Sequence, residues 1–263
     1  MQITGTVCVV TGGANGIGRA LANEFARRGA AAVVVADVDI DHATAVAERI
    51  GGLAVECDVA QSGAIDELVG RVREAYGRID VFCSNAGVAD ARTGDLTAPL
   101  EKFERVIQVN MVAHLAAAKA VVPDMAERGS GYLLQTLSSA ALIGGPAPAG
   151  YTMAKFGALG LAEWLRLHYG DRGVRVSCLC PNAVYTGMQG RPKDLDAPAE
   201  LPEGAAAMEM LLPEDVAIQT VDAMEGAEPF LILPHPRVGE SFARKAANYD
   251  EWLARASARL SRF

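Results

Sequence analysis

The chain has 263 residues, of which 51% are hydrophobic and 21% charged. This balance is typical of a globular protein with a large core and excludes a largely disordered chain. The formal net charge is −8 and no basic run occurs, so we expect no nucleic-acid-binding surface. The length suits one α/β domain or two small ones.

The first apolar run, residues 6–10, follows Met1 without a charged and then apolar leader. We therefore expect no signal peptide and a cytoplasmic location. The longest purely apolar stretch, residues 30–36, is too short to span a bilayer, so no membrane association is expected. The five cysteines lie in or beside strand-like segments and fit reduced core thiols: Cys8, Cys57, Cys83, Cys178 and Cys180. No two histidines have metal-ligand spacing, so we predict no metal site.

Strand-like apolar runs alternate with amphipathic helical stretches along the chain. The expected strands are residues 6–11, 31–37, 53–58, 81–85, 132–138, 174–180 and 230–233. The expected helices are residues 18–28, 41–50, 62–76, 101–128, 151–172 and 213–224. Strands rich in Val, Ile and Leu without polar alternation indicate burial on both faces. The pattern predicts a Rossmann-type α/β fold: one doubly wound parallel sheet of about seven strands, with helices on both faces and a single domain over 1–263.

Two segments depart from this alternation. Residues 186–212 contain several Pro and Gly residues and read as a substrate lid. Residues 240–263 are helical in pattern, with Tyr249, Trp252 and Leu253 as apolar anchors. We expect this C-terminal extension to pack on the core or on a neighbouring subunit.

A glycine-rich turn links the first strand to the first helix. Gly12 permits a tight turn, Gly16 a close approach of the backbone to a pyrophosphate, and Gly18 close packing of helix on strand. Asn15 and Ile17 belong to the same turn, whose helix N-terminus favours phosphate groups. A plain strand-to-helix turn is the alternative interpretation.

Asp37 ends the second strand, nineteen positions after Gly18. A carboxylate there can accept both adenosine ribose hydroxyls and would repel the additional phosphate of NADP. Neighbouring Val38 and Asp39 offer no cation for that phosphate, and Asn15 is uncharged. The sequence therefore favours NAD, unless Asp37 merely ends a strand.

Tyr151 and Lys155 are four residues apart and share one face of a helix. A free Tyr has a pKa of about 10, which a nearby ammonium and a nicotinamide cation would lower. A shift to near neutrality requires about 4 kcal/mol. Tyr151 would then exchange a proton with a substrate hydroxyl. Ser138 ends a strand, where its hydroxyl can bond the substrate oxygen; adjacent Ser139 is a rival.

Several motifs occur in order along the chain: residues 11–18, 57–59, 85–87, Asn110, Ser138, 151–155 and 181–186. Together and in this order, they resemble the motifs of the short-chain dehydrogenase/reductase family over at least residues 6–233. The resemblance implies that Lys155 also bonds the nicotinamide ribose and that Asn110 holds a water linking Lys155 to solvent. It further implies cofactor contacts from these residues: Asp58 and Val59 at adenine, Asn85, Ala86 and Gly87 on the adenosine side, and Pro181, Val184 and Thr186 near the carboxamide.

Two departures from the family pattern stand out. Asn182 occupies the position of the usual Gly after Pro181; we expect the turn to survive because Asn tolerates a left-handed backbone. Residues 233–237 replace the usual Gly-Gly after the last strand, and His235 among them is either a turn residue or a group at the substrate rim.

We therefore expect an oxidoreductase that transfers a hydride between NAD(H) and a secondary alcohol or ketone. The pocket is expected to be apolar and shaped by Leu142, Gly144, Pro146, Gly150, Met188, Met208 and Met210. The main alternative is a catalytically silent NAD-binding regulator; a sugar-nucleotide epimerase and a methyltransferase fit less well. By resemblance, the helices at 101–128 and 151–172 would pair subunits into a homodimer or homotetramer.

Overall fold

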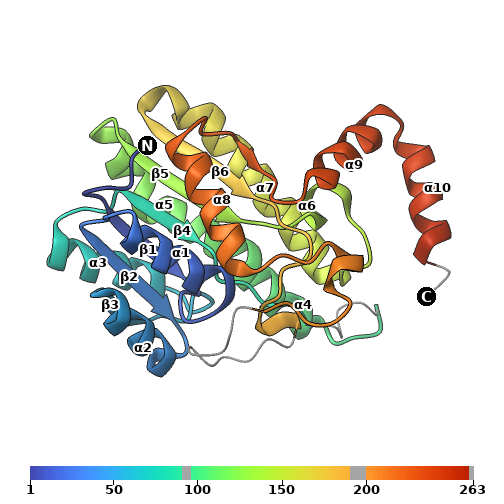
Figure 1. Cartoon of the computed structure of the whole chain (residues 1–263). Helices are drawn as coiled ribbons and strands as arrows, with labels where there is room; N and C mark the ends of the chain where they lie inside the picture. The colour runs from blue at the N-terminus through green and yellow to red at the C-terminus, as the bar shows by residue number, and fades with distance from the viewer. Residues whose placement is uncertain (91–95, 190–199, 261–263) are drawn as a thin grey trace.

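A computed structural model describes residues 1–90, 96–189 and 200–260. Its core is one seven-stranded parallel sheet in the order β3-β2-β1-β4-β5-β6-β7 (Figure 1). The strands are β1 Val7–Thr11, β2 Ala32–Asp37, β3 Leu53–Glu56, β4 Val81–Ser84, β5 Gly131–Thr136, β6 Val174–Leu179 and β7 Leu231–Ile232. The predicted doubly wound fold is thereby confirmed.

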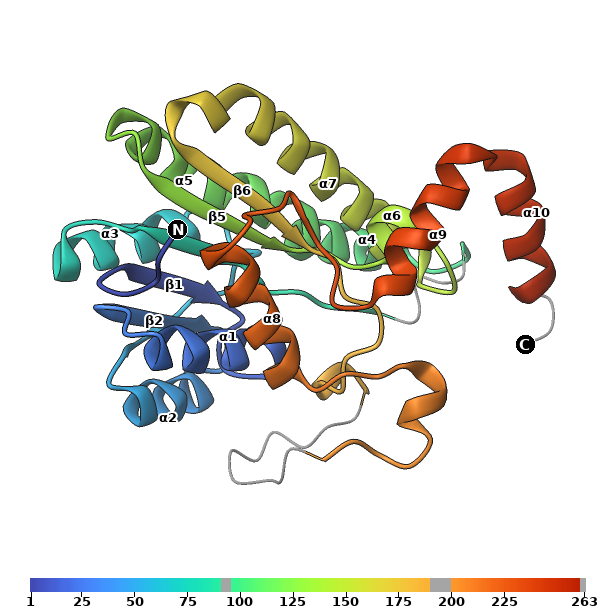
Figure 2. The ribbon, with the colours of Figure 1, turned by 45° about the horizontal axis from the view of Figure 1, so that its top comes forward.

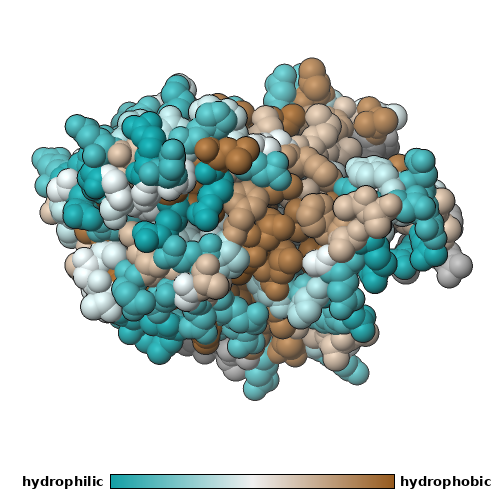
Figure 3. Space-filling view, turned by 90° about the horizontal axis from the view of Figure 1, so that it is seen from above, coloured by the Kyte–Doolittle hydropathy of each residue, from teal (hydrophilic) through white to brown (hydrophobic). Residues whose placement is uncertain are grey.

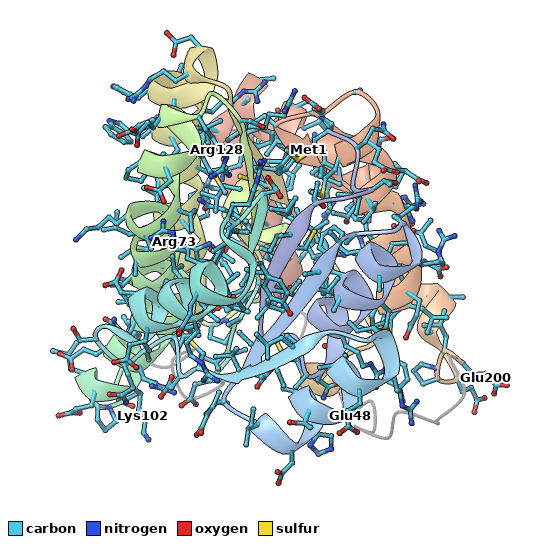
Figure 4. All side chains as sticks on the ribbon, turned by 90° about the vertical axis from the view of Figure 1, so that its left-hand side faces the viewer. Met1, Glu48, Arg73, Lys102, Arg128 and Glu200 are labelled. Carbon is cyan, nitrogen blue, oxygen red and sulfur yellow. The ribbon has the colours of Figure 1, made fainter. Side chains whose placement is uncertain are left out.

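Helices cover both faces of this sheet. On one face α1 packs on α8 and α2, and on the other α5 lies between α3 and α7 (Figures 1 and 2). The helices are α1 Gly16–Arg27, α2 Ile40–Ile50, α3 Ala64–Tyr76, α4 Leu100–Ile107, α5 Ala113–Glu127, α6 Ala140–Ile143, α7 Ala149–Tyr169, α8 Pro213–Glu225, α9 Pro236–Ala247 and α10 Tyr249–Leu260. Arg73 of α3 donates to the Ala120 carbonyl of α5 at 2.8 Å, which joins two helices of one face (Figure 4).

Alternate residues of each strand enter two separate cores. In β1, Val7 and Val9 face the α5 side, whereas Cys8 and Val10 face the α1 side. Both sets are buried, which explains why the strands show no polar alternation. All five cysteines are free and buried, as expected.

The strand order reverses between β1 and β4, so helices leave these strands toward opposite faces. In open α/β sheets, the carboxyl ends of the strands at such a reversal form a crevice that binds ligands. The chain thus builds its crevice beside the glycine-rich turn.

The helix expected at 101–128 is interrupted by a π-helical turn, Gln108–Val112, between α4 and α5. The combined helix, Leu100–Glu127, is long and apolar enough to cross a membrane, but half of its most apolar window is buried in the protein. A core helix passes the same test, so the absence of a membrane span stays a prediction. The short α6 was not predicted, and its four residues follow β5 after residues 137–139.

The C-terminal extension forms a helical hairpin. Helix α9 packs on α6, whereas α10 contacts α9 and projects from the main body (Figures 1 and 2). The contact of α9 with α6 brings the first part of the extension onto the main body, whereas Tyr249 and Leu253 in α10 are 54% and 53% exposed. Packing on a neighbouring subunit stays a prediction, and residues 261–263 lie outside the described part.

The anchor of the hairpin is Lys245. This side chain is buried and donates to the carbonyl of Leu142 at 2.8 Å. Its ammonium lies 4.7 Å from the centre of the Phe156 ring and 5.0 Å from that of Tyr249. Apolar atoms form a band between the main body and this hairpin (Figure 3).

Candidate functional site

A cavity of about 510 Å³ lies at the carboxyl ends of the central strands. The predicted site residues that line it are Gly12, Asn15, Gly16, Ile17, Asp37, Asn85, Gly87, Ser138, Tyr151, Lys155, Pro181, Val184 and Thr186. The structure thus brings the glycine-rich turn and the Tyr-Lys pair to one site.

The glycine-rich turn has no room for side chains. A Cβ on Gly12 would lie 2.8 Å from the Cα of Ala86, and one on Gly18 would lie 2.1 Å from the carbonyl oxygen of Gly12. Asn85 closes the turn by donating from Nδ2 to the Thr11 carbonyl at 3.0 Å. Gly18 and Ala86 therefore support the turn by packing and do not line the cavity.

The beginning of α1 faces the cavity. Asn15 caps this helix, because its Oδ1 accepts the Gly16 N–H at 2.8 Å. A Cβ on Gly16 would lie 3.2 Å from a methyl group of Thr186, so this glycine keeps the space between turn and opposite wall open. The free N–H groups and positive end of the helix dipole suit a phosphate group here.

Asp37 is held at the cavity wall by backbone donors. Its Oδ2 accepts the Ala14 N–H at 3.0 Å, and its Oδ1 accepts the Asp39 N–H at 3.0 Å. Each carboxylate oxygen retains a lone pair for a further donor. Asp37 can therefore accept a hydrogen bond from a donor in the cavity.

Helix α7 carries Tyr151 and Lys155 into the cavity. The Lys155 ammonium lies 5.6 Å from the centre of the Tyr151 ring and donates to the carbonyl of Thr136 at 2.8 Å. Lys155 is 2% exposed, and burial lowers its pKa to about 8. The side chain is thus fixed, and its charge depends on pH near neutrality.

In the protein alone, the pKa of Tyr151 is not lowered as the sequence led us to expect. Burial raises this pKa, and the hydrogen bond with the Ser138 hydroxyl partly opposes the effect. A phenolate at neutral pH therefore requires additional positive charge in the cavity.

The two serines after β5 have different environments. Ser138 lines the cavity, whereas the hydroxyl of Ser139 donates to Oδ1 of Asn182 at 3.0 Å. Asn182 itself lines the cavity wall. Its backbone does not adopt a positive φ, so the tolerance of Asn for left-handed backbone is not what preserves this turn.

Asn110 lies in the π-helical turn, outside the cavity wall. Its Nδ2 donates to the carbonyls of Val88 at 2.8 Å and Val106 at 2.9 Å, and its Oδ1 accepts the Val88 N–H at 3.3 Å. A Cβ on Gly87 would lie 3.0 Å from this Oδ1 and 3.9 Å from the Lys155 ammonium. The amide is thus committed to the backbone next to Lys155, and the implied water could use only its remaining lone pair or the main chain.

Other predicted residues lie away from the cavity. Val38 is 63% exposed, Asp58 pairs with Arg105 at 3.3 Å, and Val59 is buried in the core. Of the expected pocket residues, Met188 lines the cavity, but Leu142 is in the core and Gly144, Pro146, Gly150, Met208 and Met210 are not among the lining residues. Residues 190–199 of the expected lid lie outside the described part.

Several cavity residues were not predicted. Val88, Thr136, Leu137 and Gly187 line the wall, and each of them immediately adjoins a predicted motif or belongs to the strand that leads to Ser138. Their positions next to a motif are the only signal that could have identified them. Among the described residues, no group of three or more His, Cys, Asp and Glu is placed to bind a metal, and the expectation of no metal stays a prediction.

The sequence profile described as "short chain dehydrogenase" matches residues 6–195. A (-)-isopiperitenol/(-)-carveol dehydrogenase of Mentha piperita is 38% identical over 70% of this chain and 72% of its own. A 1-deoxy-11-beta-hydroxypentalenate dehydrogenase of Streptomyces exfoliatus is 38% identical over 88% of this chain and 84% of its own. A short-chain dehydrogenase/reductase of Burkholderia phymatum, solved with NAD, superposes with a TM-score of 0.81 at 26% identity, covering 95% and 96% of the two chains.

Proposed function

Because this chain belongs to the short-chain dehydrogenase/reductase family, an oxidoreductase family, we propose that it transfers a hydride between NAD(H) and a secondary alcohol or ketone. The observation that carries this proposal is the common cavity of Tyr151, Lys155, Ser138 and the glycine-rich turn. A regulator without turnover would have no need of a buried Lys held beside a Tyr.

The preference for NAD over NADP follows from charge. Asp37 presents a carboxylate at the position expected to meet the adenosine ribose, and a phosphate there would be repelled. Among the described residues that line the cavity, Lys155 is the only cation, and α7 places it with Tyr151. No described lining residue therefore offers a charge partner for an additional phosphate near Asp37.

The proposed chemistry assigns one proton transfer to Tyr151. In the oxidative direction its phenolate oxygen takes the substrate hydroxyl proton, and in the reductive direction its phenol returns that proton. Ser138 donates a hydrogen bond to the substrate oxygen and orients it toward Tyr151. Lys155 supplies positive charge and, by family resemblance, bonds the nicotinamide ribose. When bound, the cofactor supplies the ring that exchanges the hydride and a cationic charge that favours phenolate.

An apolar substrate is supported by the walls of the cavity. Val88, Leu137, Val184 and Met188 lie beside the polar catalytic groups. Two relatives are named dehydrogenases of isopiperitenol and carveol and of a 1-deoxy-11-beta-hydroxypentalenate. We therefore propose a cyclic, mainly apolar secondary alcohol or its ketone as substrate class.

Assembly into a homodimer or homotetramer is part of the proposal. Helix α7 exposes Met153, Phe156, Trp164 and Leu167, which are 38–79% exposed, and α5 exposes Leu115. Apolar side chains on long neighbouring helices suit a subunit contact. A cytoplasmic location remains our expectation for the assembled enzyme.

The test is to add NAD⁺ and NADP⁺ separately to purified protein with a panel of ring alcohols and polar polyols, and to follow reduced nicotinamide by absorbance. Turnover with NAD⁺ that is lost in Tyr151→Phe is the expected result. Binding of NAD⁺ without turnover on any alcohol would favour the regulator, and a preference for NADP⁺ would refute the role given to Asp37. Faster turnover of polyols would refute the apolar substrate class.

A further inference from the structure

The two departures from the family pattern, Asn182 and the segment at 233–237, contact each other through His235. The N–H of Asn182 donates to Nδ1 of His235 at 3.1 Å, although the two residues are 53 positions apart. The other ring nitrogen, Nε2, lies 3.1 Å from the carbonyl oxygen of Ala183. His235 is 3% exposed and precedes α9, between two prolines. The substituted Gly and the substituted Gly-Gly thus form one structural unit.

The two contacts fix the protonation of this ring. A backbone N–H can only donate, so Nδ1 must accept, and the proton of the neutral imidazole is on Nε2, which donates to Ala183. Burial lowers the pKa of His235, and the backbone carbonyl groups of Ala183 and Glu209 partly oppose this effect. Both ring nitrogens are therefore used, which a residue that only fills a turn would not require.

The segment held by His235 leads to both sides of the active site. Asn182 accepts the Ser139 hydroxyl at 3.0 Å, and the carbonyl of Pro181 accepts the Ser139 N–H at 2.7 Å. Ser139 is bonded directly to Ser138 in the chain. The position of the substrate-binding hydroxyl thus depends on the backbone that His235 fixes.

The same segment also holds the described end of the expected lid. The Ala183 carbonyl accepts the Leu211 N–H at 3.0 Å as well as the His235 ring, and the Leu211 carbonyl accepts the Tyr185 N–H at 2.9 Å. Arg237, two residues beyond His235, pairs with Glu209 at 2.8 Å. His235 therefore lies where the loop at 181–186, the described end of the expected lid and the C-terminal hairpin meet.

We propose that His235 is a positioning residue that fixes Asn182 and Ala183, and so sets the placement of Val184, Thr186 and Ser138 and ties the lid segment to them. The effect on catalysis rests on the proposed function. Misplacement of reacting groups by about 1 Å can reduce a rate by about 100-fold, so such a residue acts on turnover without touching substrate.

The first measurement uses cofactor-free protein. We compare amide hydrogen exchange in His235→Leu, His235→Asn and the wild type, with Thr220→Val as control because it removes a buried hydroxyl bond within α8. We expect exchange at 182–186 and 211 to rise about tenfold in His235→Leu, with β1 unchanged. His235→Asn keeps an acceptor near the Asn182 N–H and should restore part of the protection. Unchanged exchange in this segment, or equal acceleration in β1, would overturn the inference.

The second measurement separates the two ends of the cofactor. We expect His235→Leu to lower kcat by about 10- to 100-fold while the Kd of ADP-ribose, which lacks nicotinamide, changes less than about threefold. Equal weakening of ADP-ribose binding, or an unchanged kcat, would overturn the positioning role. If the wild type binds no NAD⁺, the proposed function fails, whereas the exchange measurement still tests the placement.

Discussion

The unit β1–α1–β2 and the region after β6 build opposite sides of one cavity in different ways. In β1–α1–β2, the turn depends on missing side chains: Gly12 and Gly18 allow backbone to meet backbone. After β6, buried polar side chains bond distant carbonyls: His235 contacts the carbonyl of Ala183, and Lys245 donates to that of Leu142 and holds the C-terminal hairpin. The glycines of the first region lie within eight residues of sequence, whereas the bonds of the second join residues 52 and 103 positions apart. We therefore expect any atom added to the glycine-rich turn to destabilise the protein strongly. In the region after β6, we expect each substitution to remove only the contribution of the bonds that its side chain makes.

The largest effect is expected from adding a methyl group to the turn. A Cβ in Gly18→Ala would lie 2.1 Å from the Gly12 carbonyl oxygen, so the turn must move, and we expect a loss of about 3 kcal/mol or more in the free energy of unfolding. The matched control is Gly70→Ala in α3, where nothing lies within 4 Å; it should stabilise the protein by about 0.5–1 kcal/mol. Urea denaturation measures both. Equal effects of the two substitutions would remove the contrast between the regions.

The corresponding test of the C-terminal region is Lys245→Met. The Leu142 carbonyl loses its donor and two aromatic rings lose a cation, so we expect a loss of about 2–3 kcal/mol. The exposed Lys119→Met should change stability by less than about 0.5 kcal/mol. Thermal and urea unfolding give the values. A loss as small as that of Lys119→Met would show that Lys245 does not anchor the hairpin.

A third test concerns His114, a buried polar group on α5. Burial, and then the charge of Lys155, lower the pKa of His114 on α5 to about 3. The unfolded chain therefore binds a proton below about pH 6.5 that the folded chain does not, and stability falls as pH decreases from there toward about 3. At pH 5 this loss amounts to about 2 kcal/mol.

Urea denaturation of wild type and His114→Gln at pH 7.5 and pH 5 isolates this term. The variant should lose about 2 kcal/mol less than the wild type over that interval, whatever its stability at pH 7.5. Parallel losses in the two proteins would mean that His114 is protonated in the folded state.

The smallest effect is expected on α10. Leu253 is 53% exposed and its helix contacts α9, so Leu253→Ser should alter the stability of the single chain by less than about 0.5 kcal/mol. Leu21→Ala in α1, where the side chain is fully buried, should cost about 2–5 kcal/mol. A large loss in Leu253→Ser, dependent on protein concentration, would place α10 in a subunit contact.

Local spacing predicted the fold and the residues that the structure brings to one cavity. The glycine-rich turn, Asp37 at a strand end and the Tyr151–Lys155 pair are recognisable because neighbours in sequence share a turn or a helix face. The seven strands followed from runs of residues buried on both faces. These features require no knowledge of distant contacts.

Long-range contacts set the limit of prediction. The bond from His235 to Asn182 and that from Lys245 to Leu142 depend on where α9 returns to the sheet, which no periodicity reports. Tyr249, Trp252 and Leu253 were the anchors expected from the sequence, and the contact of the buried Lys245 with the Leu142 carbonyl could not be read from their pattern. The burial that raises the pKa of Tyr151 was likewise invisible in the spacing to Lys155.

The π-helical turn at Gln108–Val112 changes the phase of the long helix that contains it. An α-helix advances about 100° per residue, so one extra residue in a turn rotates everything beyond it by roughly that angle. Helix α4 can thus turn Phe103 and Val106 inward, while α5 aligns Val121 and Met125 on the sheet from a different angular setting. A one-residue deletion in this turn would restore a regular helix and carry Asn110 away from Val88. One inserted residue thus sets the angle between the buried face of α4 and that of α5.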